Sequence, residues 1–126
     1  MDIQRVRTAT PWESKVGFCR VLRAGNTVWT AGTVAADDQG QIHGADTYEQ
    51  CCYIFEKLQR ALAEAGSSLD HAVKVTSFIT DIDQAEGFTR AHKQYVGHAE
   101  PVCTCVVVAA LFGDALVELE VTALIP

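Results

Sequence analysis

The sequence has no apolar run near the roughly 18 residues that a membrane-spanning helix needs. Its first segment, residues 1–13, is polar and lacks the apolar centre of a signal peptide. These absences predict a cytoplasmic protein without membrane contact. Basic side chains are also scarce, with 10 Lys and Arg against 16 Asp and Glu and a net charge of −6. Because a nucleic-acid-binding protein needs a basic surface to neutralise phosphates, we expect no nucleic-acid partner.

Cysteine and histidine spacings typical of zinc sites are missing as well, since no C-x-x-C or H-x-x-x-H pattern occurs. We therefore expect neither a metal nor a cofactor. Five cysteines, an odd number, fit a reducing compartment better than a disulfide framework. The length of 126 residues, 48% of them apolar, matches one domain with a real core. We assign residues 1–126 to this domain and expect 1–14 to be an irregular N-terminal arm.

Hydrophobic periodicity predicts the element order β-β-α-β-α-β-β. Asp46 followed by Glu49 is a capping-box pattern that begins a helix, and Gly66 is typical of the residue after its end. A second helix is expected over 84–96, with an apolar face of Ala85, Phe88, His92 and Tyr95. Strands are expected at 16–22, 27–31, 72–79, 102–111 and 115–125.

The segment 102–111 reads Val-Cys-Thr-Cys-Val-Val-Val-Ala-Ala-Leu and does not alternate apolar with polar residues. A strand that is apolar on both sides must be buried on both sides. Two amphipathic helices can cover only one face of the sheet, so the other face must meet another subunit. The sequence therefore predicts an obligate oligomer.

Several segments together resemble the Rid (YjgF) family, whose members are also called L-PSP endoribonucleases. They are 16–18 (VGF), 25–33 (GNTVWTAGT), 62–66 (LAEAG), 73–81 (VKVTSFITD) and 117–121 (VELEV). The resemblance implies a chorismate-mutase-like α+β fold with two helices on one face of a mixed sheet. It also implies a homotrimeric barrel with pockets for small metabolites between subunits.

The resemblance further implies hydrolysis of reactive imines and enamines, with Glu118 orienting the attacking water. The arginine that binds the substrate carboxylate in the family is replaced here by Cys103, so the usual carboxylate clamp is lost. The remaining pocket positions are matched by Phe18, Ala31 and Thr89, and Gly32 lies where the backbone approaches the ligand. Arg20 lies near the end of the first expected strand, and Arg23 directly follows it. A solvated edge is their expected place, although either could reach the pocket and supply a positive charge.

Cys103 and Cys105 are two residues apart on one strand and share a face. Cys103 is a candidate nucleophile with His92 as its base, which requires a lowered thiol pKa. The alternative is that both cysteines are small apolar residues of the core. Glu118 is either a general acid and base for water addition or a structural carboxylate.

Two functions follow from these residues. The first is a Rid-like hydrolase or deaminase of a small imine or enamine, with Glu118 and Cys103 as catalytic residues. Its substrate-binding residues would be Phe18, Ala31, Gly32, Thr89, His92 and Cys105. The alternative is a non-catalytic, metabolite-binding or protein-protective trimer. A ribonuclease is disfavoured by the net charge of −6.

Overall fold

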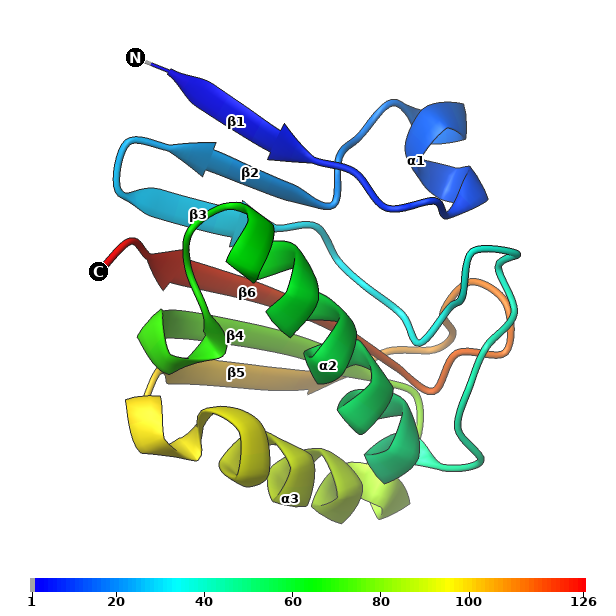
Figure 1. The fold of residues 1–126 in the computed structure, drawn as a ribbon. Helices are drawn as coiled ribbons and strands as arrows, with labels where there is room; N and C mark the ends of the chain where they lie inside the picture. Colours follow the sequence, from blue (N-terminus) through cyan, green and yellow to red (C-terminus); the bar gives the residue numbers. More distant parts are fainter. Residues whose placement is uncertain (1) are drawn as a thin grey trace.

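A computed structural model describes residues 2–126 as a mixed sheet with its two long helices on one face (Figure 1). The six strands lie in the order β1-β2-β3-β6-β4-β5, and only β4 and β5 run parallel. The predicted α+β class is confirmed. The strands are β1 (Ile3–Val6), β2 (Val21–Ala24), β3 (Thr27–Thr30), β4 (Ala72–Ile79), β5 (Val102–Val107) and β6 (Val117–Leu124). The helices are α1 (Pro11–Val16), α2 (Thr47–Glu64) and α3 (Ala85–Val96), with short 3-10 turns η1 (Leu69–His71), η2 (Ile82–Gln84) and η3 (Gly97–Ala99).

Helix α2 begins and ends as its local sequence predicts. The side chain of Asp46 accepts a hydrogen bond from the backbone N–H of Glu49 at 2.8 Å, and Glu49 in turn accepts one from the N–H of Ala45 at 2.7 Å. Such a cap contributes about 1 kcal/mol. Gly66 follows the helix with a φ of +86°, which only glycine adopts without strain. The face between these ends is buried against the sheet through Cys51, Ile54, Phe55, Leu58 and Leu62.

The N-terminal segment differs from the prediction. Residues 1–14 were expected to be irregular, but they contain β1 and most of α1, while Met1 lies outside the described residues. The strand expected over 16–22 begins only at Val21, because Val16 ends α1 and Gly17 leaves it with a φ of +94°. A strand as short as β1 is stable only through its pairing with β2, which a local pattern does not show.

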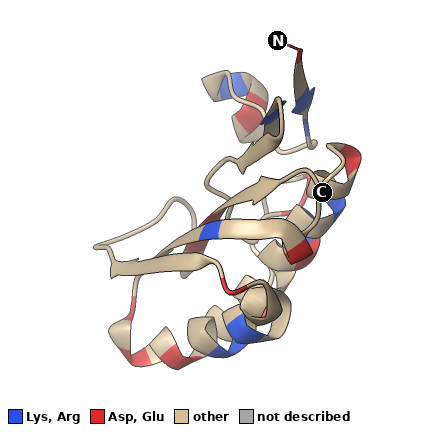
Figure 2. Ribbon diagram, turned by 90° about the vertical axis from the view of Figure 1, so that its left-hand side faces the viewer, with Lys and Arg blue, Asp and Glu red and all other residues tan. Residues whose placement is uncertain are grey.

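The two strands near the C-terminus are shorter than predicted. The strand expected over 102–111 ends at Val107, and the one expected over 115–125 spans only Val117–Leu124. Along β6, residues 117, 119, 121 and 123 are buried beneath the helices, and the alternate residues point to the open face. Edge strand β5 is exposed throughout, with Val102 68% and Val107 51% accessible. Figure 2 shows that charged residues lie mainly on the helices and near the N-terminus, while the strands are mostly uncharged. Burial of this surface by a neighbouring subunit stays a prediction.

None of the helices within residues 2–126 combines the length and the apolar character needed to cross a lipid bilayer.

Candidate functional site

A cavity of about 620 Å³ lies on the face of the sheet that the helices leave uncovered. Helix α1 and the segments after β3 and β5 form its walls, and β4 and β6 contribute the side chains of their open face. The cavity brings together four residues that the sequence predicted, namely Phe18, Ala31, Gly32 and Glu118. The other lining residues are mostly apolar or aromatic: Trp12, Lys15, Val16, Arg20, Val34, Phe78, Phe112 and Glu120. The arrangement suits a small molecule with an apolar body.

Glu118 is the half-buried carboxylate of this cavity. It pairs with Phe78 across β6 and β4, so both side chains point to the open face. Burial raises the pKa of Glu118 above its ordinary value, and the nearby carboxylate of Glu120 raises it further. The positive charge of Arg20 acts in the opposite direction. A carboxyl group with a raised pKa exchanges protons more readily near neutral pH than an exposed glutamate does.

Arg20 does not lie at a solvated edge, which corrects the main expectation for it. Only 3% of its surface is accessible, and its guanidinium lies 5.3 Å from the centre of the Phe18 ring. Nη1 donates to the carbonyl oxygen of Gly32 at 3.1 Å and to the hydroxyl of Thr33 at 2.9 Å. The buried Nε has no hydrogen-bond partner among residues 2–126. Arg20 therefore brings a positive charge to the cavity and holds the backbone beside Glu118.

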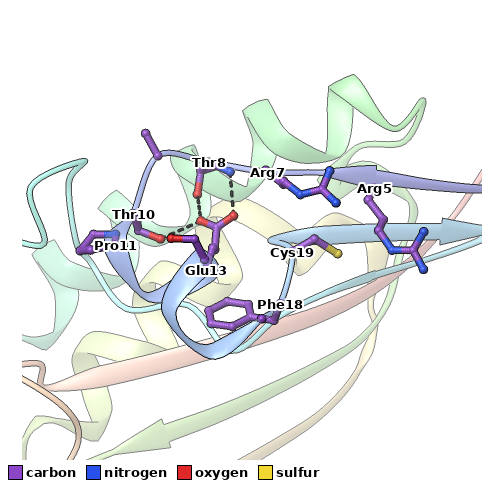
Figure 3. Close-up of a pocket in the computed structure, with 11 residues that line it drawn as sticks. Arg5, Arg7, Thr8, Thr10, Pro11, Glu13, Phe18 and Cys19 are labelled. Atoms are coloured by element: carbon purple, nitrogen blue, oxygen red, sulfur yellow. Dashed lines mark hydrogen bonds between the residues drawn. The ribbon is translucent and has the colours of Figure 1, made fainter.

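The partner of Arg20 is Glu13, a residue that the sequence reasoning missed. Nη2 of Arg20 lies 3.3 Å from Oε2 of Glu13, and both side chains are only 4% accessible. Figure 3 shows how Thr8 and Thr10 converge on the same carboxylate. Thr8 donates through its N–H at 2.8 Å and through its hydroxyl, and the Thr10 hydroxyl donates at 2.7 Å.

Burial alone would raise the pKa of Glu13, but the hydrogen bonds from Thr8 and Thr10, together with Arg20, lower it below its ordinary value. Glu13 therefore stays ionised and balances the buried guanidinium. In the sequence, an acidic residue just after Pro11 looks like an ordinary residue of a helical first turn. No local signal could have revealed its contact with Arg20.

Cys103 and Cys105 lie away from Glu118 in the protomer. On β4, Cys103 pairs with Val75 and Cys105 with Ser77, and both β4 residues are buried under the helices. The two cysteines therefore point to the helix side of the sheet. Glu118 pairs with Phe78 and points to the opposite, open face. The thiol of Cys105 donates to the hydroxyl of Ser77 at 3.7 Å. Although β5 is exposed as a strand, partial desolvation of the Cys103 thiol raises its pKa, and Cys105 raises it further. That direction is opposite to the one that a nucleophilic thiolate requires.

His92 and Thr89 on α3 do not line the Glu118 cavity either. The imidazole of His92 packs against Phe55 and Phe88, with ring centres 6.4 Å and 5.4 Å away. Burial lowers its pKa, which favours the neutral ring, and its buried Nε2 has no partner within residues 2–126. Thr89 is exposed and donates its hydroxyl to the carbonyl oxygen of Ala85 at 3.2 Å. Among the described residues, no three His, Cys, Asp or Glu side chains are grouped closely enough to hold a metal ion.

The sheet order, the one-sided helix layer and a glutamate in a largely apolar cavity define a small α+β domain whose cavity has the size of a metabolite site. The profile of the endoribonuclease L-PSP family matches residues 8–125, so the chain belongs to this family. This finding confirms the family resemblance found in the sequence.

Individual relatives agree with this assignment. A RutC family protein of Pyrococcus abyssi is 31% identical over 107 residues, covering 84% of each chain. The structure of Rv2704 from Mycobacterium tuberculosis, a member of the YjgF/YER057c/UK114 family, is similar with a TM-score of 0.89 and 31% identity, covering 98% of this chain and 99% of that one. The structure of Escherichia coli TdcF with bound serine is similar with a TM-score of 0.79 and 27% identity, covering 95% and 93%.

Proposed function

We propose that this protein hydrolyses a small imine or enamine to a carbonyl compound and ammonia in the cavity around Glu118. The observation that carries the proposal is the position of Glu118, a carboxylate with a raised pKa in an apolar cavity. TdcF of E. coli, 29% identical over 102 residues, is named a reactive intermediate deaminase, which supports the same reaction class here.

In the proposed reaction, Glu118 accepts a proton from a water molecule as its oxygen attacks the carbon of the C=N bond. The substrate enters as the protonated imine, so its nitrogen receives the electron pair of the C=N bond and the neutral tetrahedral carbinolamine forms. Glu118 then gives its proton to the nitrogen and accepts the hydroxyl proton as the C–N bond breaks and the C=O bond forms, and it passes that proton to the departing ammonia. An enamine would first gain a proton at carbon to become the imine. The cycle consumes one water and leaves Glu118 as it began.

The polar groups around the cavity favour a substrate that does not depend on a carboxylate. By the family resemblance Cys103, which lies outside the cavity of the protomer, takes the place of the arginine clamp, and a thiol carries no positive charge. The positive charge of Arg20 is already balanced by Glu13. Lys15 is the other cation of the lining, and it is exposed. The rings of Trp12 and the neighbouring phenylalanines would instead bind the apolar body of the substrate.

We further propose that the working site lies between the subunits of a cytoplasmic homotrimer. The apolar strand β5 is exposed in the protomer, which supports burial by another copy. Glu118 lies on the open face of the sheet and Cys103 on the other. Contact between the β5 edge of one copy and the cavity of the next would unite these two sets of predicted residues. The free cysteines support a location in the cytoplasm, because thiols stay reduced there.

The test compares two imines that are generated in the assay by oxidases. An amine oxidase acting on a primary amine supplies an imine without a carboxylate. An amino acid oxidase acting on an amino acid supplies an imine that carries one. Loss of imine that can be trapped by semicarbazide is followed over time. We expect the protein to speed hydrolysis of the carboxylate-free imine, and Glu118→Gln to abolish this effect. Glu86→Gln, at an exposed position on α3, is the matched control and should behave as wild type.

Two other outcomes would reject the proposal. Saturable binding of the imine without faster hydrolysis would instead support the alternative, a non-catalytic metabolite-binding trimer. Unchanged hydrolysis in Glu118→Gln would show that another group activates the water.

A further inference from the structure

A second cavity, of about 550 Å³, shares no lining residue with the Glu118 site. It lies beside α2 and the loop after β3, and Lys57 of α2 lines it. Only 8% of the surface of Lys57 is accessible, and such burial is rare for a lysine without an ion-pair partner. Nζ donates one hydrogen bond, to the carbonyl oxygen of Ala36 at 3.1 Å. Within residues 2–126, no carboxylate lies within ion-pair distance of this amine.

The charges around Lys57 do little to keep it protonated. Burial lowers the pKa of Lys57 to about 8, and the positive charges of Arg20 and Arg60 act in the same direction. Glu13 and Asp38 oppose this shift without cancelling it.

The remaining charged residues of the lining do not select an anionic or a cationic ligand. Besides Lys57, the cavity holds two arginines and three acidic residues, namely Arg7, Arg60, Asp37, Asp38 and Glu64. One of them is already engaged, because the carboxylate of Asp37 lies 2.8 Å from Nε2 of His43 and accepts the N–H groups of Gln39 and Gln41. The distinctive group of the cavity is therefore the amine.

With a pKa of about 8, Lys57 holds far more of the neutral amine at pH 7 than an ordinary lysine does. The neutral amine is the nucleophilic form, and desolvated lysines are the ones that form Schiff bases with carbonyl compounds. Tyr53 lines the same cavity. Because burial raises the pKa of Tyr53, this group stays protonated and is available as a hydrogen-bond donor to a carbonyl oxygen.

We propose that Lys57 is a covalent capture site for small aldehydes, separate from the Glu118 cavity. The lone pair of Nζ forms a bond to the aldehyde carbon, and a proton passes from nitrogen to oxygen to give a carbinolamine. The hydroxyl then leaves with the remaining N–H proton as water, and the C=N bond of an imine forms. Addition of water reverses the reaction, so no oxidant, reductant or further reactant is needed.

The test treats the whole protein at pH 7 with a limiting amount of propionaldehyde and sodium cyanoborohydride, which reduces the imine and makes the label permanent. Peptide mapping by mass spectrometry then measures the label on each of the lysines, Lys15, Lys57, Lys74 and Lys93. The other three are exposed, so they report ordinary reactivity. We expect at least tenfold more label on Lys57 than on any of them. The preference should shrink as the pH rises towards 10, since the exposed amines then lose their protons too.

Lys57→Met removes the amine and keeps the apolar stem, and it should lose the preferential label while the other lysines are unchanged. Lys93→Met, at an exposed position of α3, is the matched control and should leave the label on Lys57 intact. If Lys57 serves only to donate its hydrogen bond to the carbonyl oxygen of Ala36, it should stay unlabelled. Wild-type protein that shows no excess of label at Lys57 therefore overturns the proposal. The wild-type map decides the question even if Lys57→Met does not fold.

Discussion

The carboxylate of Glu118 lies against the backbone of Gly32, so closely that a Cβ on residue 32 would stand 3.0 Å from Cδ of Glu118 and 3.1 Å from Oε1. The carbonyl oxygen of Gly32 is in turn held by Arg20 at 3.1 Å. The glycine is therefore needed for space, since no positive φ requires it at this position. Any side chain at residue 32 must displace the proposed acid and base.

Gly32→Ala tests this contact. We expect a folded protein, because the atoms that the new methyl meets belong to a side chain that can turn away. We expect at least tenfold slower imine hydrolysis, because a displacement of about 1 Å in a catalytic group can cost ~10²-fold in rate. Gly97→Ala is a matched control, since its new Cβ meets only the side chain of Lys93, at 3.2 Å. Equal activity of the two variants would show that the position of Glu118 does not limit the reaction.

The buried pair of Glu13 and Arg20 should be a major source of stability. Glu13→Gln leaves the guanidinium without a counter-charge, which typically costs about 3–5 kcal/mol. Chemical denaturation of wild type and variant measures the loss. Asp70→Asn, which removes an exposed partner of His98, should cost less than about 1 kcal/mol. A similar small effect for both substitutions would mean that the buried pair contributes little.

The same pair predicts a pH dependence of stability. Because the pKa of Glu13 is lowered in the folded protein, its contribution is fully present above the ordinary value of 4.5 and is lost as the pH falls through the lower, folded value. The difference in unfolding free energy between wild type and Glu13→Gln should therefore shrink in acid. A difference that stays constant from pH 7 to pH 3 would contradict this assignment.

The exposed strand β5 predicts self-association. Val107→Asp places a charge on a side chain that is 51% accessible in the protomer, and we expect it to dissociate or unfold the assembly. Ile82→Asp is the control, because residue 82 is 70% accessible and lies in η2, outside the strands of the sheet. Analytical ultracentrifugation of wild type and both variants measures the assembly. A wild-type protein that sediments as a monomer at micromolar concentration would refute the proposed trimer and the shared site.

The raised pKa of Cys103 predicts a slow thiol. At pH 7 we expect Cys103 to react with iodoacetamide no faster than the cysteine of a short unstructured peptide, because only the thiolate attacks. Mass spectrometry of the alkylated peptides identifies the residue, and Cys103→Ser provides the blank. A rate well above that of the peptide would restore Cys103 as a candidate nucleophile.

Much of the fold could be predicted, because its signals are local. Asp46 and Glu49 form a capping box that marks the start of α2 from neighbouring residues alone. The β-branched run 72–79 coincides with β4. The pocket residues Phe18, Ala31, Gly32 and Glu118 came from the family resemblance, and the structure brings them to one cavity. The β1 strand and α1 were missed because their residues carry little periodicity and depend on β2 and Arg20 for their place.

The chain alone determined the α+β class, the two amphipathic helices and an apolar strand that one copy leaves uncovered, because spacing and composition decide which faces avoid water. Only the tertiary structure decided that Arg20 is buried against Glu13 and that Cys103 and Glu118 point to opposite faces of the sheet. It also decided that the amine of Lys57 is buried beside a second cavity. These relations depend on strand register and on contacts between distant segments, where a shift of one residue would exchange the faces.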